Sequence, residues 1–258
     1  MNYYNEFDPR AADKLESLIQ RGLLTPGYVD RRSIVDVMPC DLDGYDQCHF
    51  FAGYGGWPLA LALAGWAWPI WSGSAPCQPF SCAGKHKGLD DERHLWPHLD
   101  RLIEAKRPSV VVGEQVARAI GKGWLDVVSS DFKSHDYEFG ATVFKACSCG
   151  SPTERERLYW AAANTKCERG QRLVEGENPC VPGQRHWRGK EDLRRVYERP
   201  VERGDLWPQP IIRRVDDGVS ERVGRLRGYG NAVDIRAAVM FIRALMGALC
   251  AMQEEATQ

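Results

Sequence analysis

The sequence lacks a long uninterrupted run of apolar residues. Its two longest apolar stretches, around 57–70 and 237–252, are broken by proline, glycine or arginine. Neither reaches the roughly 18 apolar residues that a membrane-spanning helix needs. The start, MNYYNEFDPR, also lacks the basic and then apolar segments of a secretory signal. We therefore expect a cytoplasmic protein that is not associated with a membrane.

Regular cysteine spacing is missing as well, although the chain has nine cysteines. An odd number without a secretory signal favours reduced thiols over a disulfide framework. The spacing of Cys147, Cys149, Cys167 and Cys180 is not that of a zinc site. We therefore expect no metal.

The chain has almost no net charge, −1 at pH 7, so overall charge does not indicate a nucleic-acid partner. The charge is unevenly distributed, however: residues 165–227 contain fifteen Lys and Arg against eleven Asp and Glu, and most of these cations are Arg. Arginine suits contacts to phosphate and guanine. An Arg-rich surface that only faces solvent explains the same composition.

Strand-like and helix-like segments alternate along the 258 residues, which indicates an α/β fold with a mainly parallel sheet. Residues 165–210 are rich in Gly, Pro, Arg and Glu and lack periodicity, which predicts a small loop-rich region. The expected strands are 2–7, 32–37, 48–52, 68–72, 109–112, 137–144 and 158–163. The expected helices begin at Pro9 and cover 57–63, 95–105, 124–130 and 234–252.

Two short motifs follow expected strands, at the sheet edge where α/β folds place their sites. The glycines of Phe51-Ala-Gly-Tyr-Gly-Gly56 let a ligand approach backbone amides at a helix start, although a purely structural turn explains them equally well. Ala75-Pro-Cys-Gln-Pro-Phe-Ser81 is more specific, because two prolines there flank a cysteine. A nearby positive charge or helix start would raise its thiolate fraction.

Together with other motifs in the same order, this segment resembles the motifs of the C5-cytosine DNA methyltransferase family. The motif sequences are most similar to those of phage- and prophage-encoded members. The resemblance covers nearly the whole chain except about 165–210. It implies a doubly wound sheet of the S-adenosylmethionine-dependent type, with a catalytic domain at 1–164, a target-recognition region at 165–227 and a C-terminal motif and helix at 228–258. The motifs that carry it are PCQPFS with GKHKG and DER after it, Gly113-Glu-Gln-Val116, Arg155-Glu-Arg157-Leu-Tyr, Gly228-Tyr-Gly-Asn-Ala-Val233 and FAGYGG.

The resemblance implies the catalytic roles. Cys77 is the expected nucleophile towards cytosine C6, Glu114 the group that binds and protonates N3, and Arg155 and Arg157 the arginines around the flipped-out base. Two neighbours depart from the family pattern, Gln115 in place of Asn and Thr153 in place of Gln. The residues expected to contact DNA are Gln78, Ser81, Lys85, Lys87, Arg93, Arg213 and Arg214.

The implied cofactor is S-adenosylmethionine, but the motifs for its ribose and adenine are not at their usual place between FAGYGG and PCQ. Asn5–Arg10 resembles the ribose motif and Val29–Ile34 the adenine motif, so we infer that these segments are permuted. We therefore expect the strand at 2–7 to lie beside the FAGYGG strand. Glu6 would bind the ribose hydroxyls, Phe7 pack on the adenine, and Asp30 accept from its amino group. The other expected cofactor residues are Phe51, Gly53, Gly55, Gly56, Trp57, Pro76, Asn231 and Val233.

The expected function is therefore transfer of a methyl group from S-adenosylmethionine to C5 of cytosine in double-stranded DNA, by a monomer in the cytoplasm of a bacterial host. Three alternatives remain open: an RNA cytosine methyltransferase, a non-catalytic DNA-binding relative and an enzyme that uses a modified cofactor. The sequence indicates neither the recognition sequence nor a companion nuclease.

Overall fold

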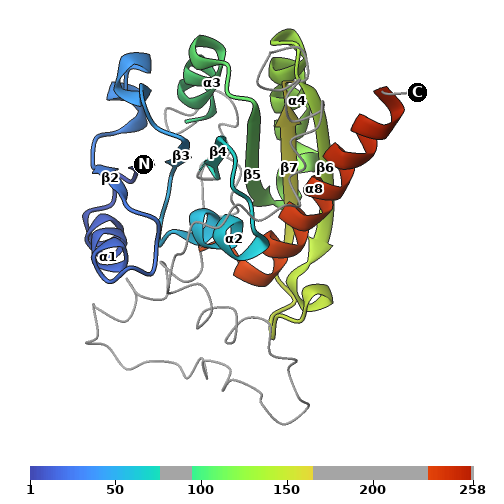
Figure 1. Ribbon diagram of the computed structural model, residues 1–258. Coiled ribbons are helices and arrows are strands. Elements are labelled where there is room, and N and C mark those ends of the chain that lie inside the picture. The colour runs from blue at the N-terminus through green and yellow to red at the C-terminus, as the bar shows by residue number, and fades with distance from the viewer. Residues whose placement is uncertain (76–94, 165–231, 257–258) are drawn as a thin grey trace.

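The computed structural model describes residues 1–75, 95–164 and 232–256, and for 252–256 it describes the backbone only. The described chain forms one seven-stranded sheet in the order β2-β1-β3-β4-β5-β7-β6 (Figure 1). The first five strands in this order are parallel, whereas β7 is antiparallel to both β5 and β6. The strands are β1 (Asn2–Asn5), β2 (Gly27–Asp30), β3 (Gln47–Phe50), β4 (Ile70–Gly73), β5 (Val110–Val116), β6 (Glu138–Lys145) and β7 (Glu156–Ala163).

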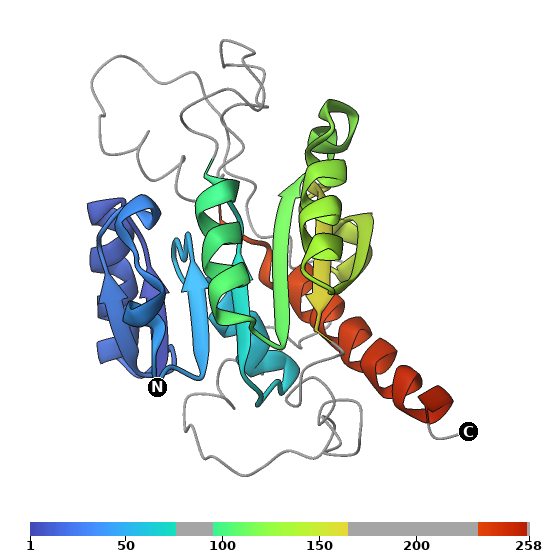
Figure 2. The same cartoon turned by 90° about the horizontal axis from the view of Figure 1, so that it is seen from above.

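Helices cover both faces of the sheet, which the two perpendicular views show (Figures 1 and 2). One core packs α3 and α4 on the sheet face that carries Trp71, Val111 and Trp160. The opposite face packs against α1, α2 and α8. The fold is therefore the doubly wound α/β sheet that the sequence predicted. The helices are α1 (Pro9–Gln20), α2 (Gly56–Ala64), α3 (Trp96–Lys106), α4 (Trp124–Ser134) and α8 (Ile235–Ala256).

Local sequence explains where the helices near the site begin and end. Asp8 caps α1 by accepting a hydrogen bond from the Ala11 amide, and Pro9 fills the first turn. The short helix α2 lies between Gly55 and Gly65, whose φ angles of +76° and +87° are in the left-handed region that glycine adopts without strain. These signals agree with the expected start of α1 and with the expected start and end of α2.

The expected strand at 32–37 is wrong. The structure has β2 at Gly27–Asp30 and a 3-10 helix at Ile34–Asp36. The Asp30 carboxylate accepts from the Arg32 amide and guanidinium, which turns the chain immediately after β2. The Ser33 hydroxyl then caps the 3-10 helix. Side-chain hydrogen bonds to the backbone therefore outweigh the strand propensity of isoleucine and valine here.

The expected neighbourhood of the N-terminal strand is confirmed. β1 pairs in parallel with β3, with Asn2 opposite Gln47 and Asn5 opposite Phe50, although about 45 residues separate them. On its other side β1 pairs with β2. The remaining expected strands and helices agree with the structure to within a few residues at their ends. The proposed target-recognition region, 165–227, lies outside the described residues, so the domain boundaries stay a prediction.

Candidate active site

The candidate site lies at the sheet edge where the parallel strands β1, β3, β4 and β5 have their carboxyl ends. β7 runs the opposite way and therefore begins at this same edge. In α/β sheets, ligands bind at this edge. Five segments that are distant in sequence meet there: Glu6 after β1, Phe51–Gly56 after β3, Ser74 and Ala75 after β4, Glu114 within β5, and Arg155 and Arg157 at the start of β7.

Glu6 joins the end of β1 to the glycine-rich turn after β3. Its Oε2 accepts a hydrogen bond from the Gly53 amide at 2.7 Å, and its Oε1 accepts from the Asp8 amide at 2.8 Å. Burial raises the pKa of this carboxyl, while the two amides act in the opposite direction. A carboxylate has about four acceptor positions, and the backbone amides around Glu6 do not use all of them, so acceptor capacity remains for a ligand hydroxyl.

The glycine-rich turn has an unusual backbone. Phe51, Gly53 and Gly55 all have positive φ, +52°, +54° and +76°. At Phe51 this conformation is strained, because a bulky side chain with positive φ costs roughly 1–3 kcal/mol. The neighbouring strands and the Glu6 contact hold the turn in this shape. Strain of this kind is concentrated at ligand sites.

Phe7 follows Glu6 and is 70% exposed, which is unusual for a phenylalanine. It therefore presents an apolar ring to solvent beside the Glu6 carboxylate. This geometry suits the expected packing on an adenine, which stays a prediction.

Asp30, the expected acceptor for adenine, makes its hydrogen bonds within the protein. Its side chain is 1% exposed. Its carboxylate already accepts from the Tyr3 hydroxyl at 2.7 Å and from the guanidinium of Arg32 at 2.6 Å. These contacts lower the pKa of Asp30 against the opposing effect of burial. Asp30 is therefore held by Tyr3 and Arg32 at the end of β2, and its contact with adenine stays a prediction.

Glu114 is the buried acid of the site, with 7% of its surface exposed. Its Oε1 lies 2.7 Å from Nε of Arg157 and 3.9 Å from Nη2 of Arg155. Burial raises the pKa of Glu114 above its usual range, although both arginines oppose the shift. Burial and the Arg157 charge lower the pKa of Arg155. The structure thus brings the three expected polar catalytic residues together.

Gln115, one of the two departures from the family pattern, contacts the segment that leads to Cys77. Its Nε2 donates to the Ala75 carbonyl at 3.2 Å, and its Oε1 accepts from the Val116 amide at 3.0 Å. The side chain is buried, so these hydrogen bonds fix it in one orientation. Glutamine therefore supplies a support two residues before the expected nucleophile.

The C-terminal motif lies beside the glycine-rich turn Phe51–Gly56, which is called the cofactor turn after its expected role. A Cβ added at Gly56 would lie 3.0 Å from Cβ of Val233, so these two expected cofactor residues are in contact. Arg155 donates to the Ala232 carbonyl at 2.8 Å, and Ser151 donates to Asp234 at 2.7 Å. The start of α8 is thereby attached to the Arg155–Arg157 segment.

Trp57 and Ser74 form a contact that sequence reasoning did not foresee. Trp57 was expected at the cofactor, and its indole Nε1 donates to Ser74 Oγ at 2.9 Å. Ser74 was not singled out, because nothing in a serine after a short strand distinguishes it from a solvated one. Its only signal was its place three residues before Cys77.

Several expected site residues lie outside the described part of the chain. They are Pro76, Cys77, Gln78, Ser81, Lys85, Lys87, Arg93, Arg213, Arg214 and Asn231. Their roles stay predictions.

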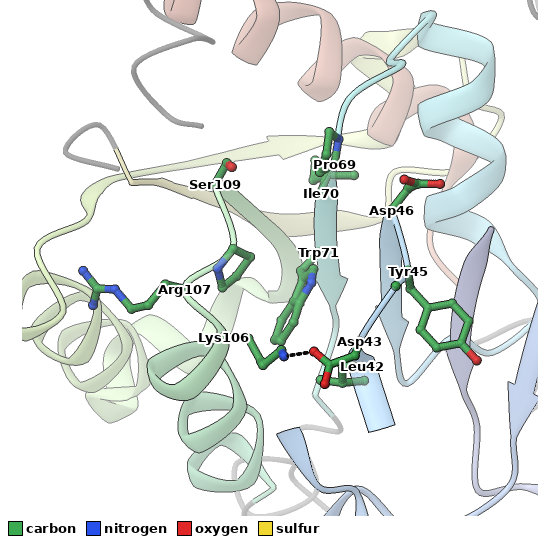
Figure 3. A pocket seen from close by; sticks show the side chains of 12 residues that line it. Leu42, Asp43, Tyr45, Asp46, Pro69, Ile70, Trp71, Lys106, Arg107 and Ser109 are labelled. Atoms are coloured by element: carbon green, nitrogen blue, oxygen red, sulfur yellow. Dashed lines mark hydrogen bonds and ion pairs between the residues drawn. The ribbon is translucent and has the colours of Figure 1, made fainter. Parts of the chain in front are cut away.

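A pocket at the opposite, amino-terminal edge of the sheet does not belong to this site (Figure 3). It is lined by the segments before β3, β4 and β5, with Trp71 at its wall. Lys106 in it pairs with Asp43, and Arg107 lies over the ring of Tyr137. Both of its cations are therefore engaged within the protein.

No helix within the described residues is long and apolar enough to cross a membrane. No group of three or more His, Cys, Asp or Glu side chains in the same ranges is arranged to hold a metal ion.

The chain was also compared with known proteins. Residues 63–200 match the family model described as C-5 cytosine-specific DNA methylase. Type II methyltransferase M.HhaI of Haemophilus parahaemolyticus is 40% identical over 88 residues, which cover 33% of this chain and 27% of that protein. Type II methyltransferase M.NlaX of Neisseria lactamica is 38% identical over 94 residues, 35% of this chain and 30% of that protein.

Among solved structures, the S. pombe Dnmt2 methyltransferase aligns with a TM-score of 0.41 and 13% identity, covering 65% of this chain and 52% of that one. The chain aligns with less than a third of the length of the two curated relatives, M.HhaI and M.NlaX. The family model itself covers more than half of the chain. The protein belongs to the C-5 cytosine-specific DNA methylase family.

Proposed function

We propose that the chain is a DNA (cytosine-5)-methyltransferase, which transfers a methyl group from S-adenosylmethionine to C5 of a flipped-out cytosine in double-stranded DNA. The observation that carries the proposal is the buried Glu114 with Arg157 at 2.7 Å, at the same sheet edge as the Glu6–Gly53 contact. An acid with a raised pKa and a cradle for a ribose thus lie at one edge, which is the arrangement this transfer needs.

The residues present fit S-adenosylmethionine. Glu6 has acceptor positions left for ribose hydroxyls, and Phe7 presents an exposed ring beside it. A Cβ at Gly53 would meet nothing closer than 4.0 Å, so the turn leaves open space against its backbone. The cofactor, when bound, supplies the methyl group.

The chain's own residues then have distinct tasks. The Cys77 thiolate forms a bond to C6 of cytosine, which makes C5 nucleophilic. Glu114 donates a proton to N3 as negative charge develops there. Its raised pKa keeps a larger protonated fraction near neutral pH than an exposed Glu would have. After C5 has taken the methyl group, loss of the C5 proton and of the Cys77 thiolate restores the ring.

Arg157 and Arg155 hold Glu114, and their positive charges lie next to its carboxylate. With both guanidiniums nearby, the deprotonated Glu114 is stabilised after it has given up its proton. Arg155 also fixes the Ala232 carbonyl, so the C-terminal motif is part of the same unit. We assign base binding to Arg157 and support of that unit to Arg155.

We also propose that the cofactor motifs are permuted in this chain. The pairing of β1 with both β2 and β3 supports this, because it puts Glu6 next to Gly53 despite the altered chain order. Residues 165–227 are the proposed target-recognition region, on the strength of their Arg content and the resemblance.

Methylation of a plasmid tests the function. Purified protein is incubated with S-adenosylmethionine and either duplex DNA or RNA, and 5-methylcytosine is mapped at base resolution. Methylation of duplex DNA at one short sequence is expected. Methylation of RNA alone would favour an RNA enzyme, and binding of DNA without methylation would favour a non-catalytic relative.

The cysteine variant tests the mechanism. Cys77→Ser should abolish transfer and leave cofactor binding intact, because a hydroxyl is a poor nucleophile at neutral pH. Cys40→Ser is the matched control, since Cys40 is exposed and lies on the 3-10 helix Pro39–Leu42. An active Cys77→Ser protein would refute the covalent route.

A further inference from the structure

The hydroxyl of Ser74 connects the two halves of the site. It follows β4 and accepts two hydrogen bonds, one from Nε1 of Trp57 at 2.9 Å and one from the backbone amide of Glu114 at 3.1 Å. Trp57 lies in the first turn of α2, next to the cofactor turn, and Glu114 is the buried acid. One oxygen atom thus contacts a cofactor-side residue and a base-side residue.

This contact takes the place of a regular strand hydrogen bond. The parallel pairing of β4 with β5 ends at Ser72 opposite Val112. Two residues further on, the Glu114 amide therefore uses a side chain of the β4 segment as its acceptor. The position of Glu114 consequently depends on a serine side chain at the point where the ladder stops.

The approach of the two strands here requires small residues. A Cβ added at Gly113 would lie 2.4 Å from the Gly73 carbonyl oxygen and 2.2 Å from the ring of Trp160. Because both glycines precede the contact directly, the backbones come close enough for Ser74 to reach the Glu114 amide. The adjacent hydrogen bond from Gln115 to the Ala75 carbonyl holds the same segment from the next residue of β5.

Hydrogen-bond chemistry limits what Ser74 can do. A serine oxygen has two lone pairs, and here two N–H groups take both of them. The hydroxyl is therefore neither a nucleophile nor a base in this arrangement. It is an acceptor that fixes two donors relative to each other.

We propose that Ser74 is a positioning residue for methyl transfer. It fixes the position of Glu114 relative to the cofactor-side helix α2, because it is hydrogen-bonded to both Glu114 and Trp57. The inference rests on the proposed function and adds a residue to it. It implies that Trp57 and Ser74 act as a unit, so that removing either donor or acceptor displaces Glu114 relative to α2.

The test uses four single variants of the full chain and one double variant. Ser74→Ala removes the acceptor and Ser74→Thr keeps it. Trp57→Phe removes the indole N–H and keeps an aromatic ring. Trp66→Phe is the matched control, because Trp66 is similarly buried, also donates from Nε1 at 3.1 Å, and does so to the Trp68 carbonyl away from the site. The readouts are kcat, the KM for S-adenosylmethionine and the pH profile of kcat.

Ser74→Ala should lower kcat at least about tenfold, with a smaller change in KM, and should shift the limb of the pH profile that Glu114 sets. Ser74→Thr should restore kcat to within about threefold of the wild type. The double variant Trp57→Phe with Ser74→Ala should be no slower than Ser74→Ala alone, because residues that act as a unit are not additive. Trp66→Phe should change neither kcat nor the profile.

An unchanged pH profile in Ser74→Ala, or additive effects in the double variant, would overturn the inference. Amide hydrogen exchange at Glu114 gives a second readout that needs no activity: exchange should be faster in Ser74→Ala and unchanged in Trp66→Phe. A wild-type protein that transfers no methyl group would instead overturn the proposed function. The two failures are therefore distinguishable.

Discussion

At the scale of single residues, the site depends on ionisable groups that the fold removes from water. Glu6 and Glu114 are held at the same sheet edge, and burial raises the pKa of both. They differ in their partners, since backbone amides contact Glu6 and arginines contact Glu114. Glu6 therefore suits a neutral ligand with hydroxyl groups, while Glu114 suits proton transfer.

Glu6→Gln should weaken binding of S-adenosylmethionine or its demethylated product roughly tenfold to a hundredfold, because a charge-assisted hydrogen bond contributes about 1.5–3 kcal/mol. In the wild type the affinity should fall as the pH falls through the raised pKa of Glu6, at a higher pH than for an exposed Glu. In the variant this dependence should flatten. Titration calorimetry between pH 8 and pH 5 measures both effects.

Glu104→Gln is the control for this series, because Glu104 is exposed on α3 and far along the chain from the cofactor turn. Equal affinities of the Glu6→Gln variant and the wild type would show that the ribose is bound elsewhere.

His49 makes stability depend on pH. It is fully buried in β3, where its Nδ1 lies 2.8 Å from the Ser72 hydroxyl, and burial lowers its pKa from 6.5 to about 3. The folded protein therefore holds His49 neutral, while the unfolded chain takes up a proton below about pH 6.5. The contribution of neutral His49 to the free energy of unfolding is fully present above pH 6.5 and is lost as the pH falls towards 3.

The expected loss is about 1.2 kcal/mol of unfolding free energy between pH 6 and pH 5. Urea unfolding at several pH values measures it. His49→Gln should be less stable overall but should lose this slope, whereas His98→Gln, with a half-buried histidine on α3, should keep it. An unchanged slope in His49→Gln would assign the acid sensitivity to other groups.

At the scale of elements, the close contact of β4, β5 and β7 sets the position of Glu114. Gly113 is the tightest point, because a side chain there would meet both the Gly73 carbonyl and Trp160. Trp160 is itself fully buried between α3, α4 and the sheet. Neither neighbour has room to shift.

Gly113→Ala should therefore destabilise the protein by about 1–3 kcal/mol, as overpacking of a core does, and should lower activity by displacing Glu114. Gly140→Ala is the matched control, since Gly140 also lies in a strand, β6, and a Cβ there would meet nothing within 4 Å. Urea midpoints and kcat measure the two effects. A Gly113→Ala protein as stable as Gly140→Ala would show that the sheet relaxes around the methyl group.

At the scale of the whole molecule, the proposed permutation is compatible with unchanged strand positions, because the connections that it alters meet at the amino-terminal edge of the sheet. The Met1 amine pairs with Asp46 at 2.7 Å, and Asn2 donates to Gln47, which in turn donates to the Trp68 carbonyl. The segments before β1, β3 and β4 thus lie side by side, and two of them line the pocket of Figure 3. Reconnecting them requires only short links.

We therefore expect a re-ordered chain to fold and to bind the cofactor. In it, residues 45–65 come first, residues 1–44 follow after a short linker, and residues 66–258 follow after a second linker. Cofactor affinity within about threefold of the original order is expected, measured by calorimetry. The same re-ordered chain with Glu6→Ala should lose binding. A folded re-ordered chain without affinity for the cofactor would refute the proposed permutation.

The sequence by itself determined the fold class and most elements, and its motifs indicated candidate site residues. Strong local signals explain this: Asp8-Pro9 starts α1, Gly55 and Gly65 delimit α2, and the apolar run before Gly113 is a buried strand. The resemblance to the family indicated Glu114, Arg155 and Arg157 as catalytic residues, and the structure brings these three residues together.

Only the tertiary structure decided how these parts contact one another. It showed that Asp30 turns the chain and binds Arg32, because a buried carboxylate takes the nearest donors. It also showed that Ser74 joins Trp57 to Glu114, which local sequence does not encode, because the contact forms between the ends of separate strands. Residue types determine which chemistry is available, whereas the distances between strands determine which residues share it.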